Sequence, residues 1–129
     1  MEAVEGQEQL VQSRVMRVLS EESWNYFMTQ ASSEGCPVAI HFTAAWCMPS
    51  VAMNPVFEEL AMIYEDILFL VVDVDDVKEV ATKMEVKAMP TFLAMKQGGG
   101  QVVDKVVGAN PEEIRKRIDS FDQSVRASK

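Results

Sequence analysis

The sequence predicts an α/β fold with a mixed central sheet, in which three strands are linked in parallel and an antiparallel hairpin follows, all flanked by helices. Two observations predict it. Short apolar runs alternate with segments of helical periodicity, and such alternation implies a parallel sheet. Near the C-terminus the strand-like runs Pro90–Met95 and Gln101–Val107 are separated only by a short glycine-containing connection, which predicts the hairpin.

The chain has 129 residues, the length of one domain. Residues 1–12 are rich in glutamate and glutamine, and we interpret them as a mobile segment before a single domain at 13–129. The run from Arg14 to Leu19 is typical of a short edge strand. Ser20 then has the features of a helix cap, and Gly35 of the residue that ends that helix.

The middle of the chain predicts two buried strands, each followed by a helix. Val38–Thr43 and Ile67–Val72 are nearly continuous apolar runs, as in parallel strands that are covered on both faces. A helical pattern follows from about Pro49 to Tyr64, and Pro55 inside it predicts a kink. A shorter helix is expected from Asp76 to Met84.

The last element is predicted to be a helix capped by Asn110, with a proline at its first position and glutamates in its first turn. We expect its end to fray beyond about Gln123. Its apolar stripe contains Ile114, Ile118, Phe121 and Val125.

Charge and cysteine content exclude several classes of protein. The net charge of −8 disfavours generic binding to nucleic acid or to an anionic membrane. No apolar stretch approaches the ~20 residues of a membrane span, and no signal peptide is evident. Cys36 and Cys47 lie at opposite ends of a predicted strand, too far apart for a disulfide, so we interpret both as free thiols. These features predict a cytoplasmic protein. The acidic clusters are interpreted as solvated surface, not as a metal site.

Cys47 is the strongest candidate for a reactive group. It lies where the strand Val38–Thr43 gives way to the helix that begins near Pro49. Unpaired backbone N–H groups and the positive end of a helix dipole favour a thiolate there. Cys36, in contrast, precedes Pro37 at a strand entry and is interpreted as structural.

The segment Trp46-Cys47-Met48-Pro49-Ser50 resembles the Trp-Cys-Gly-Pro-Cys signature of thioredoxins. Met89-Pro90-Thr91 is similar to the cis-proline loop of that family, and Val107-Gly108-Ala109 to its glycine loop. The resemblance covers roughly residues 14–122 and implies a thioredoxin fold. The Cys-x-x-Ser motif and the segment Val72-Asp73-Val74-Asp75 resemble plant h-type relatives, notably the monocysteinic thioredoxin-like CXXS proteins.

The resemblance also implies a groove that holds extended substrate peptide beside Cys47. The residues that would form it are Trp46, Met48, Pro49, Met89, Pro90, Val107, Gly108 and Ala109. Two positions depart from the family pattern: His41 stands where thioredoxins have a buried aspartate, and Val71 where they commonly have its lysine partner.

Two residues keep two interpretations each. Ser50 either fills space in the first helical turn or donates a hydrogen bond to the Cys47 thiolate. His41 is either a neutral core residue or a proton acceptor during exchange at Cys47. Neither interpretation of Ser50 lets it release a disulfide-bound partner, because an alcohol does not attack sulfur at neutral pH.

These features predict a monothiol enzyme for thiol–disulfide exchange on protein disulfides, isomerase-like and weak as a reductase. It needs no cofactor, although glutathione can serve as the second thiol. Disulfide- or thiol-containing proteins are the expected partners; the chain is expected to be a monomer, and whether Cys47 joins two chains stays open. Two rivals are a redox-silent binding module that uses the groove at Pro90 and, less consistent with Met48-Pro49, a glutathione-ligated iron–sulfur carrier.

Overall fold

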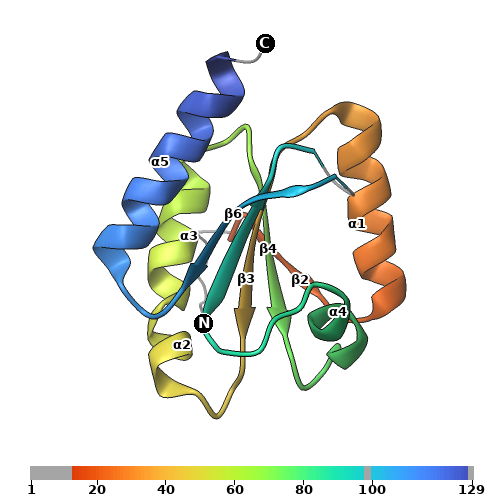
Figure 1. The fold of residues 1–129 in the computed structure, drawn as a ribbon, viewed down its shortest axis with the longest axis vertical. Helices are drawn as coiled ribbons and strands as arrows, with labels where there is room; N and C mark the ends of the chain where they lie inside the picture. The colour runs from red at the N-terminus through yellow and green to blue at the C-terminus, as the bar shows by residue number, and fades with distance from the viewer. Residues whose placement is uncertain (1–12, 98–99, 128–129) are drawn as a thin grey trace, which may run out of the picture.

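The computed structural model describes residues 13–97 and 100–127 and has a single five-stranded sheet between two layers of helices. The elements, in chain order, are β2 (Val15–Val18), α1 (Glu21–Glu34), β3 (Val38–Thr43), α2 (Met48–Ala52), α3 (Asn54–Ile63), β4 (Leu68–Asp73), α4 (Lys78–Lys83), β5 (Thr91–Met95), β6 (Val102–Val107) and α5 (Pro111–Ala127). Helices α1 and α4 cover one face of the sheet, while α2, α3 and α5 lie on the other (Figure 1). The predicted mobile segment at residues 1–12 lies outside the described residues, and the domain division at residue 13 stays a prediction.

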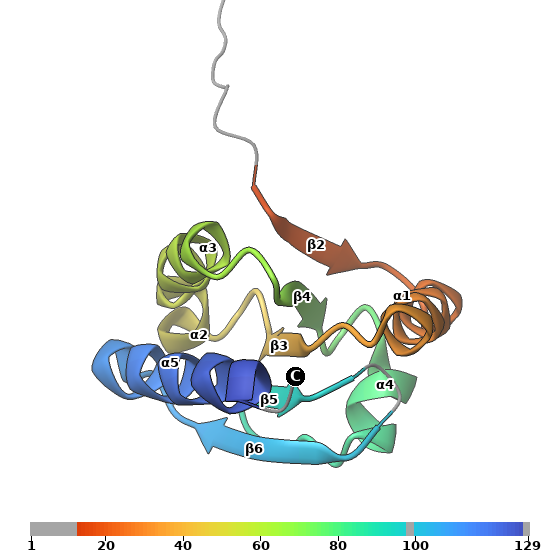
Figure 2. The ribbon, with the colours of Figure 1, turned by 90° about the horizontal axis from the view of Figure 1, so that it is seen from above.

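The strands follow the order β2-β4-β3-β5-β6 across the sheet (Figure 2). Strands β2, β4 and β3 run parallel, β5 is antiparallel to β3, and β6 is antiparallel to β5. The predicted fold class, a thioredoxin-type mixed sheet with an antiparallel hairpin, is confirmed. Strand β3 is central, and all six of its residues are buried. The functional candidates that follow β3 are therefore anchored to the most protected part of the sheet.

Two apolar cores lie on opposite faces of the sheet, because side chains of a strand alternate between its faces. The core under α1 and α4 contains, among others, Trp24, Ile40 and Phe42. The core under α3 and α5 is built around Phe57, Phe69, Phe92, Ile114 and Phe121.

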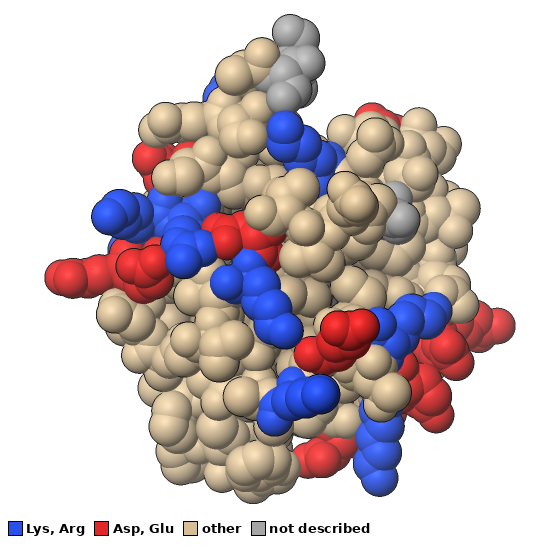
Figure 3. All heavy atoms as spheres, in the orientation of Figure 1, with Lys and Arg blue, Asp and Glu red and all other residues tan. Residues whose placement is uncertain are grey.

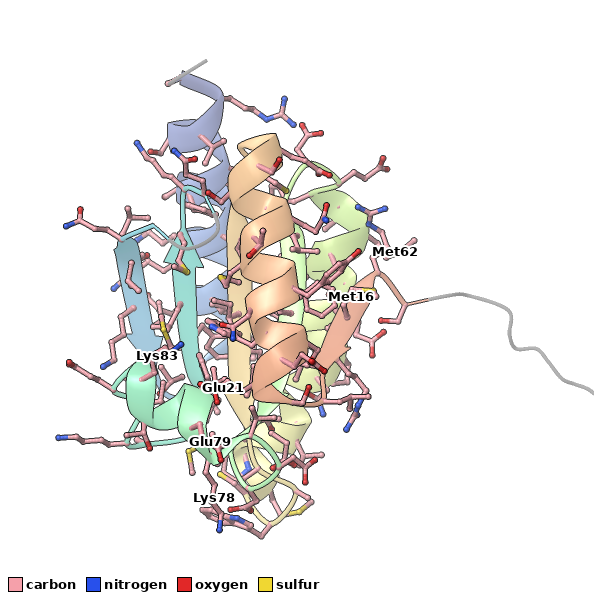
Figure 4. The ribbon with its side chains drawn as sticks, turned by 90° about the vertical axis from the view of Figure 1, so that its right-hand side faces the viewer. Met16, Glu21, Met62, Lys78, Glu79 and Lys83 are labelled. Atoms are coloured by element: carbon pink, nitrogen blue, oxygen red, sulfur yellow. The ribbon has the colours of Figure 1, made fainter. Side chains whose placement is uncertain are left out.

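Helix α1 begins and ends where its terminal residues predict. The Ser20 side chain accepts a hydrogen bond from the Ser23 N–H, and the Ser23 hydroxyl accepts one from the Ser20 N–H, which makes a reciprocal capping box. Gly35 ends the helix with a left-handed φ of 66°, a conformation that glycine adopts without steric penalty. An ion pair between Glu21 and Lys83, 3.9 Å apart, joins the start of α1 to α4 (Figure 4).

The predicted helix from Pro49 to Tyr64 was wrong in one respect, since the structure has two helices there and the break falls at Met53. Pro55 has no N–H to donate to the carbonyl of Val51, so the regular hydrogen-bond ladder is interrupted at that point. The Met53 N–H instead donates to the Ser50 carbonyl at 3.0 Å and ends α2. Pro55 then lies in the first turn of α3, where the missing N–H costs no helical hydrogen bond. At the other end of the chain, α5 continues to Ala127 and does not fray at Gln123.

Candidate active site

Cys47 is the N-cap residue of α2, at the end of the loop that leaves β3. Its N–H donates to the Ala44 carbonyl at 3.0 Å, and its own carbonyl accepts the first helical hydrogen bond, from Val51, at 3.0 Å. The side chain makes no capping bond and is half-buried. The backbone of Cys47 is thus fixed on both sides, while its sulfur stays partly accessible.

Two further loops approach Cys47 from the hairpin. The Met89–Pro90 peptide bond is cis, as the resemblance implied. The Cys47 thiol donates to the Met89 carbonyl over 3.5 Å. Gly108, with φ at 117°, donates its N–H to the Pro90 carbonyl at 3.0 Å. The three motifs, far apart in the sequence, are therefore linked in the fold: the cis-proline loop contacts the Cys47 sulfur through Met89, and the glycine loop contacts the cis-proline loop through Pro90.

The rim of this site is largely apolar and exposed. Trp46, Met48 and Val107 are 65%, 67% and 57% exposed. Pro49 and Ala109 are also exposed, whereas Met89 and Gly108 are half-buried and Pro90 is buried. In the view of Figure 3, the surface over α2 at the lower left carries almost no charged side chains.

Asp75 is a rim residue that sequence reasoning did not assign to the site. Its carboxylate accepts a hydrogen bond of 2.7 Å from the indole Nε1 of Trp46. This bond fixes the orientation of the exposed tryptophan beside Cys47. The only signal in the sequence was the Val72-Asp73-Val74-Asp75 segment, which drew attention as a family feature and not as a partner of Trp46.

Ser50 is fully buried, and its hydroxyl points into the core rather than along the rim. The hydroxyl donates to Oγ1 of Thr43 at 2.5 Å, and it lies 3.4 Å from Nε2 of His41. Of these two contacts the one to Thr43 is much the shorter, so Thr43 is the principal partner of the Ser50 hydroxyl. Thr43 was not singled out by the sequence, because a threonine at a strand end is common and carries no signature.

His41 is enclosed by aromatic rings on the same side of the sheet. Its ring stacks on Phe92 with centroids 4.6 Å apart and meets the edge of Phe57 at 5.4 Å. Burial lowers the pKa of His41 to about 4, so the ring is neutral at physiological pH. Its Nδ1 atom is buried without a hydrogen-bond partner. Of the two interpretations, this environment favours the neutral core residue over the proton acceptor.

A protein-family model described as Thioredoxin matches residues 15–120. The chain belongs to the thioredoxin family. It is 60% identical over 114 residues to Thioredoxin-like protein CXXS1 of Arabidopsis thaliana, covering 88% of this chain and 95% of the relative. It is 50% identical over 121 residues to Thioredoxin-like protein CXXS1 of Oryza sativa subsp. japonica, covering 94% of this chain and 90% of the relative. The crystal structure of thioredoxin NaTrxh from Nicotiana alata superposes with a TM-score of 0.80 at 34% identity, covering 89% of this chain and 98% of that one.

The predicted resemblance to thioredoxins of plant h-type and to CXXS proteins is therefore confirmed. Membership of the thioredoxin family makes the chain a thiol–disulfide oxidoreductase that acts on disulfide-containing proteins. Within the family it differs at Ser50, which replaces the second cysteine of the signature, and at Met48, His41 and Val71. His41 on β3 and Val71 on β4 are directly paired in the sheet, so these two differences from the family pattern are adjacent in the structure.

Over residues 13–97 and 100–127, no cluster of three or more histidine, cysteine, aspartate or glutamate side chains is arranged to hold a metal ion. Within the same described ranges, no helix has the length and apolar content required to cross a membrane.

Proposed function

We propose that this thioredoxin-family chain carries out monothiol exchange on protein disulfides, with Cys47 as its only exchanging thiol. The observation that carries the proposal is the pairing of an accessible Cys47 sulfur with a buried serine at the position of the second signature cysteine. The apolar rim of Trp46, Met48 and Val107 supports an extended protein segment as the substrate, because such surfaces bind apolar side chains.

The reaction proceeds in two balanced exchanges. The Cys47 thiolate attacks one sulfur of a substrate disulfide, so that a mixed disulfide forms and the other substrate sulfur leaves as a thiolate. A second thiolate then attacks the mixed disulfide and releases Cys47. If the second thiolate belongs to the same substrate, the outcome is isomerisation without net oxidation. If it belongs to glutathione, a glutathione-linked substrate is released, and another glutathione completes the reduction.

Cys36 is poorly suited to resolve the mixed disulfide. It precedes β3, whereas Cys47 follows it, and the six strand residues between them span roughly 20 Å at 3.3 Å per residue. The Cys36 thiol instead lies within hydrogen-bond distance of two carbonyls, those of Pro37 at 3.4 Å and Asp66 at 3.7 Å. Without an internal resolving thiol, turnover depends on an external one, whose effective concentration is orders of magnitude lower. We therefore propose isomerase-like activity with weak reduction.

The test is refolding of a scrambled-disulfide protein by the wild type, Cys47→Ser and Cys36→Ser, each with and without glutathione. We expect Cys47→Ser to fall to the uncatalysed rate and Cys36→Ser to retain the wild-type rate. The wild type should isomerise without glutathione but should reduce disulfides only when glutathione is present. Wild-type turnover equal to that of Cys47→Ser would overturn the proposal and favour a redox-silent binding module.

A further inference from the structure

The Ser50 hydroxyl lies beside Cys47 in the chain but is turned away from it. Ser50 is the third residue of α2, and Cys47 is its N-cap. A side chain at that third position can reach back to the cap residue, as the reciprocal bonds of a capping box demonstrate. In α2 no such bond forms, and the hydroxyl instead donates to Thr43 Oγ1 at 2.5 Å.

We propose that Thr43 is a positioning residue, which binds the Ser50 hydroxyl on the core side of α2 and so, among the residues that the structure describes, leaves the Cys47 sulfur without a side-chain hydrogen-bond donor. The inference rests on Cys47 being the exchanging thiol, as in the proposed function. Thr43 is 8% exposed and ends the central strand β3, so its oxygen is a fixed acceptor. His41 Nε2, at 3.4 Å, lies on the same side as Thr43 and gives the hydroxyl a second polar neighbour there.

The chemical consequence follows from how a hydrogen bond changes a thiolate. A donor aimed at the sulfur would stabilise the thiolate, lower its basicity and weaken it as a nucleophile. It would also make the sulfur a better leaving group from a mixed disulfide. By retaining the hydroxyl, Thr43 keeps Cys47 a strong nucleophile and a slow leaving group. A monothiol enzyme gains from this combination, because it must hold its substrate until a second thiol arrives.

Thr43→Val tests the inference, because valine has nearly the shape of threonine but offers no oxygen. Without the Thr43 oxygen, the Ser50 hydroxyl loses its nearest polar partner and keeps only His41 Nε2 at 3.4 Å. We expect it to turn to Cys47 once the sulfur is a thiolate, because a hydrogen bond to an ion is stronger than one to a neutral ring. The pH midpoint of Cys47 alkylation by iodoacetamide should fall by about one unit, the difference between an ionic and a neutral acceptor. The alkylation rate of the fully ionised thiol should fall about threefold. A mixed disulfide of Cys47 with glutathione should be cleaved faster by dithiothreitol.

Three matched variants, all made in a Cys36→Ser background so that only Cys47 reports, distinguish positioning from general damage. Thr43→Ser keeps an acceptor and should restore the wild-type midpoint. In a Ser50→Ala background, Thr43→Val should leave the pH midpoint of Cys47 alkylation unchanged, because residue 50 then has no hydroxyl that could donate to the sulfur. Thr43→Ala removes the same oxygen and should repeat the effect of Thr43→Val, so it serves as the second variant if valine disturbs folding. Thr43 lines a cavity of about 490 Å³.

The titratable groups on the neighbouring segments are the same in every variant. They are Asp75, which accepts from Trp46, Lys87, which precedes Met89 in the chain, and buried His41, so their influence cancels in the comparison. An unchanged midpoint in both Thr43→Val and Thr43→Ala, or a shift that persists with alanine at position 50, would overturn the inference. Absence of disulfide turnover in the wild type would instead overturn the proposed function, since alkylation reports on the sulfur whether or not exchange occurs.

Discussion

The two faces of β3 carry different kinds of side chain. Val38, Ile40 and Phe42 point to the α1 and α4 side, and all three are apolar and fully buried. His41 and Thr43 point to the α3 side, where they meet Ser50. One strand therefore supports stability on one face and positions the groups of the site on the other. The unpartnered nitrogen, Nδ1 of His41, belongs to the face that carries the site.

The largest effect is expected on the apolar face. Phe42→Ala removes a fully buried ring that packs against Trp24 at a centroid distance of 6.4 Å. The free energy of unfolding should fall by about 3–5 kcal/mol, measured by urea denaturation at pH 7. Leu19→Ala, at a residue 67% exposed, serves as the control and should change it by less than about 0.5 kcal/mol. A loss below about 1 kcal/mol for Phe42→Ala would mean that the two faces do not differ as described.

The next largest effect is the pH dependence of stability that His41 causes on the polar face of β3. The pKa of His41 is about 4 in the folded protein against 6.5 for an ordinary histidine. The unfolded chain therefore takes up a proton at a higher pH than the folded one. This contribution to stability is complete above pH 6.5 and is lost as the pH falls towards 4, by about 3 kcal/mol in total.

The variant His41→Phe isolates that pH dependence. Phenylalanine keeps the stack on Phe92 and does not titrate, so any cost of its larger size is the same at each pH. The difference in unfolding free energy between wild type and variant should change by about 3 kcal/mol between pH 7 and pH 4. The carboxylates present in both proteins cancel in this difference. A constant difference across that range would show that His41 is not the group responsible.

A smaller effect is expected from Ser50→Cys, which adds a second thiol on the polar face. Reduction of a protein disulfide should then proceed without glutathione and rise at least tenfold, equivalent to about 1.4 kcal/mol of barrier. The new thiol would face His41 and Thr43, neither of which is a carboxylate, so the rate should stay below that of a thioredoxin with two cysteines. The assay is turnover with a dithiol regenerant, and Ser50→Ala is the matched variant without a second thiol. A rate no greater than that of Ser50→Ala would contradict this expectation.

The smallest effect is expected at the ion pair between α1 and α4. Glu21 and Lys83 are about half exposed, and their charged atoms are 3.9 Å apart. Lys83→Gln should lower the unfolding free energy by less than about 0.5 kcal/mol, and less still at high salt. A double-mutant cycle with Glu21→Gln separates the pair from each residue's own effect on its helix end. A coupling energy above about 1 kcal/mol would indicate that this edge contributes more than surface charges normally do.

The sequence predicted the strands and the principal caps because these depend on local patterns. Apolar runs predicted β3 and β4, and Ser20, Gly35 and Asn110 predicted helix ends that the structure confirms. The break at Met53 was missed because Pro55 can either kink a helix or begin a new one. Met53 and Phe57 are both buried in the core under α3 and α5, and such tertiary packing cannot be read from a local pattern.

The sequence predicted only those residues of the site that belong to recognisable motifs. Cys47, the cis-proline loop and Gly108 belong to short motifs that can be recognised in the sequence. Thr43 and Asp75 instead act through contacts with residues that lie elsewhere in the chain, Ser50 and Trp46. The direction of the Ser50 hydroxyl likewise depends on a rotamer set by β3. Neither these contacts nor that rotamer produces a periodicity or a residue spacing in the sequence, so the sequence could not predict them.

The carbonyl of Met89 has one further consequence for how a partner is admitted. A protonated Cys47 donates to that oxygen over 3.5 Å, but a thiolate has no hydrogen to give. Loss of that proton would therefore change two things together: the sulfur would become the nucleophile of the proposed exchange, and the Met89 carbonyl would gain a second lone pair for an incoming backbone amide. Docking of such an amide should accordingly be tighter to the thiolate than to the thiol.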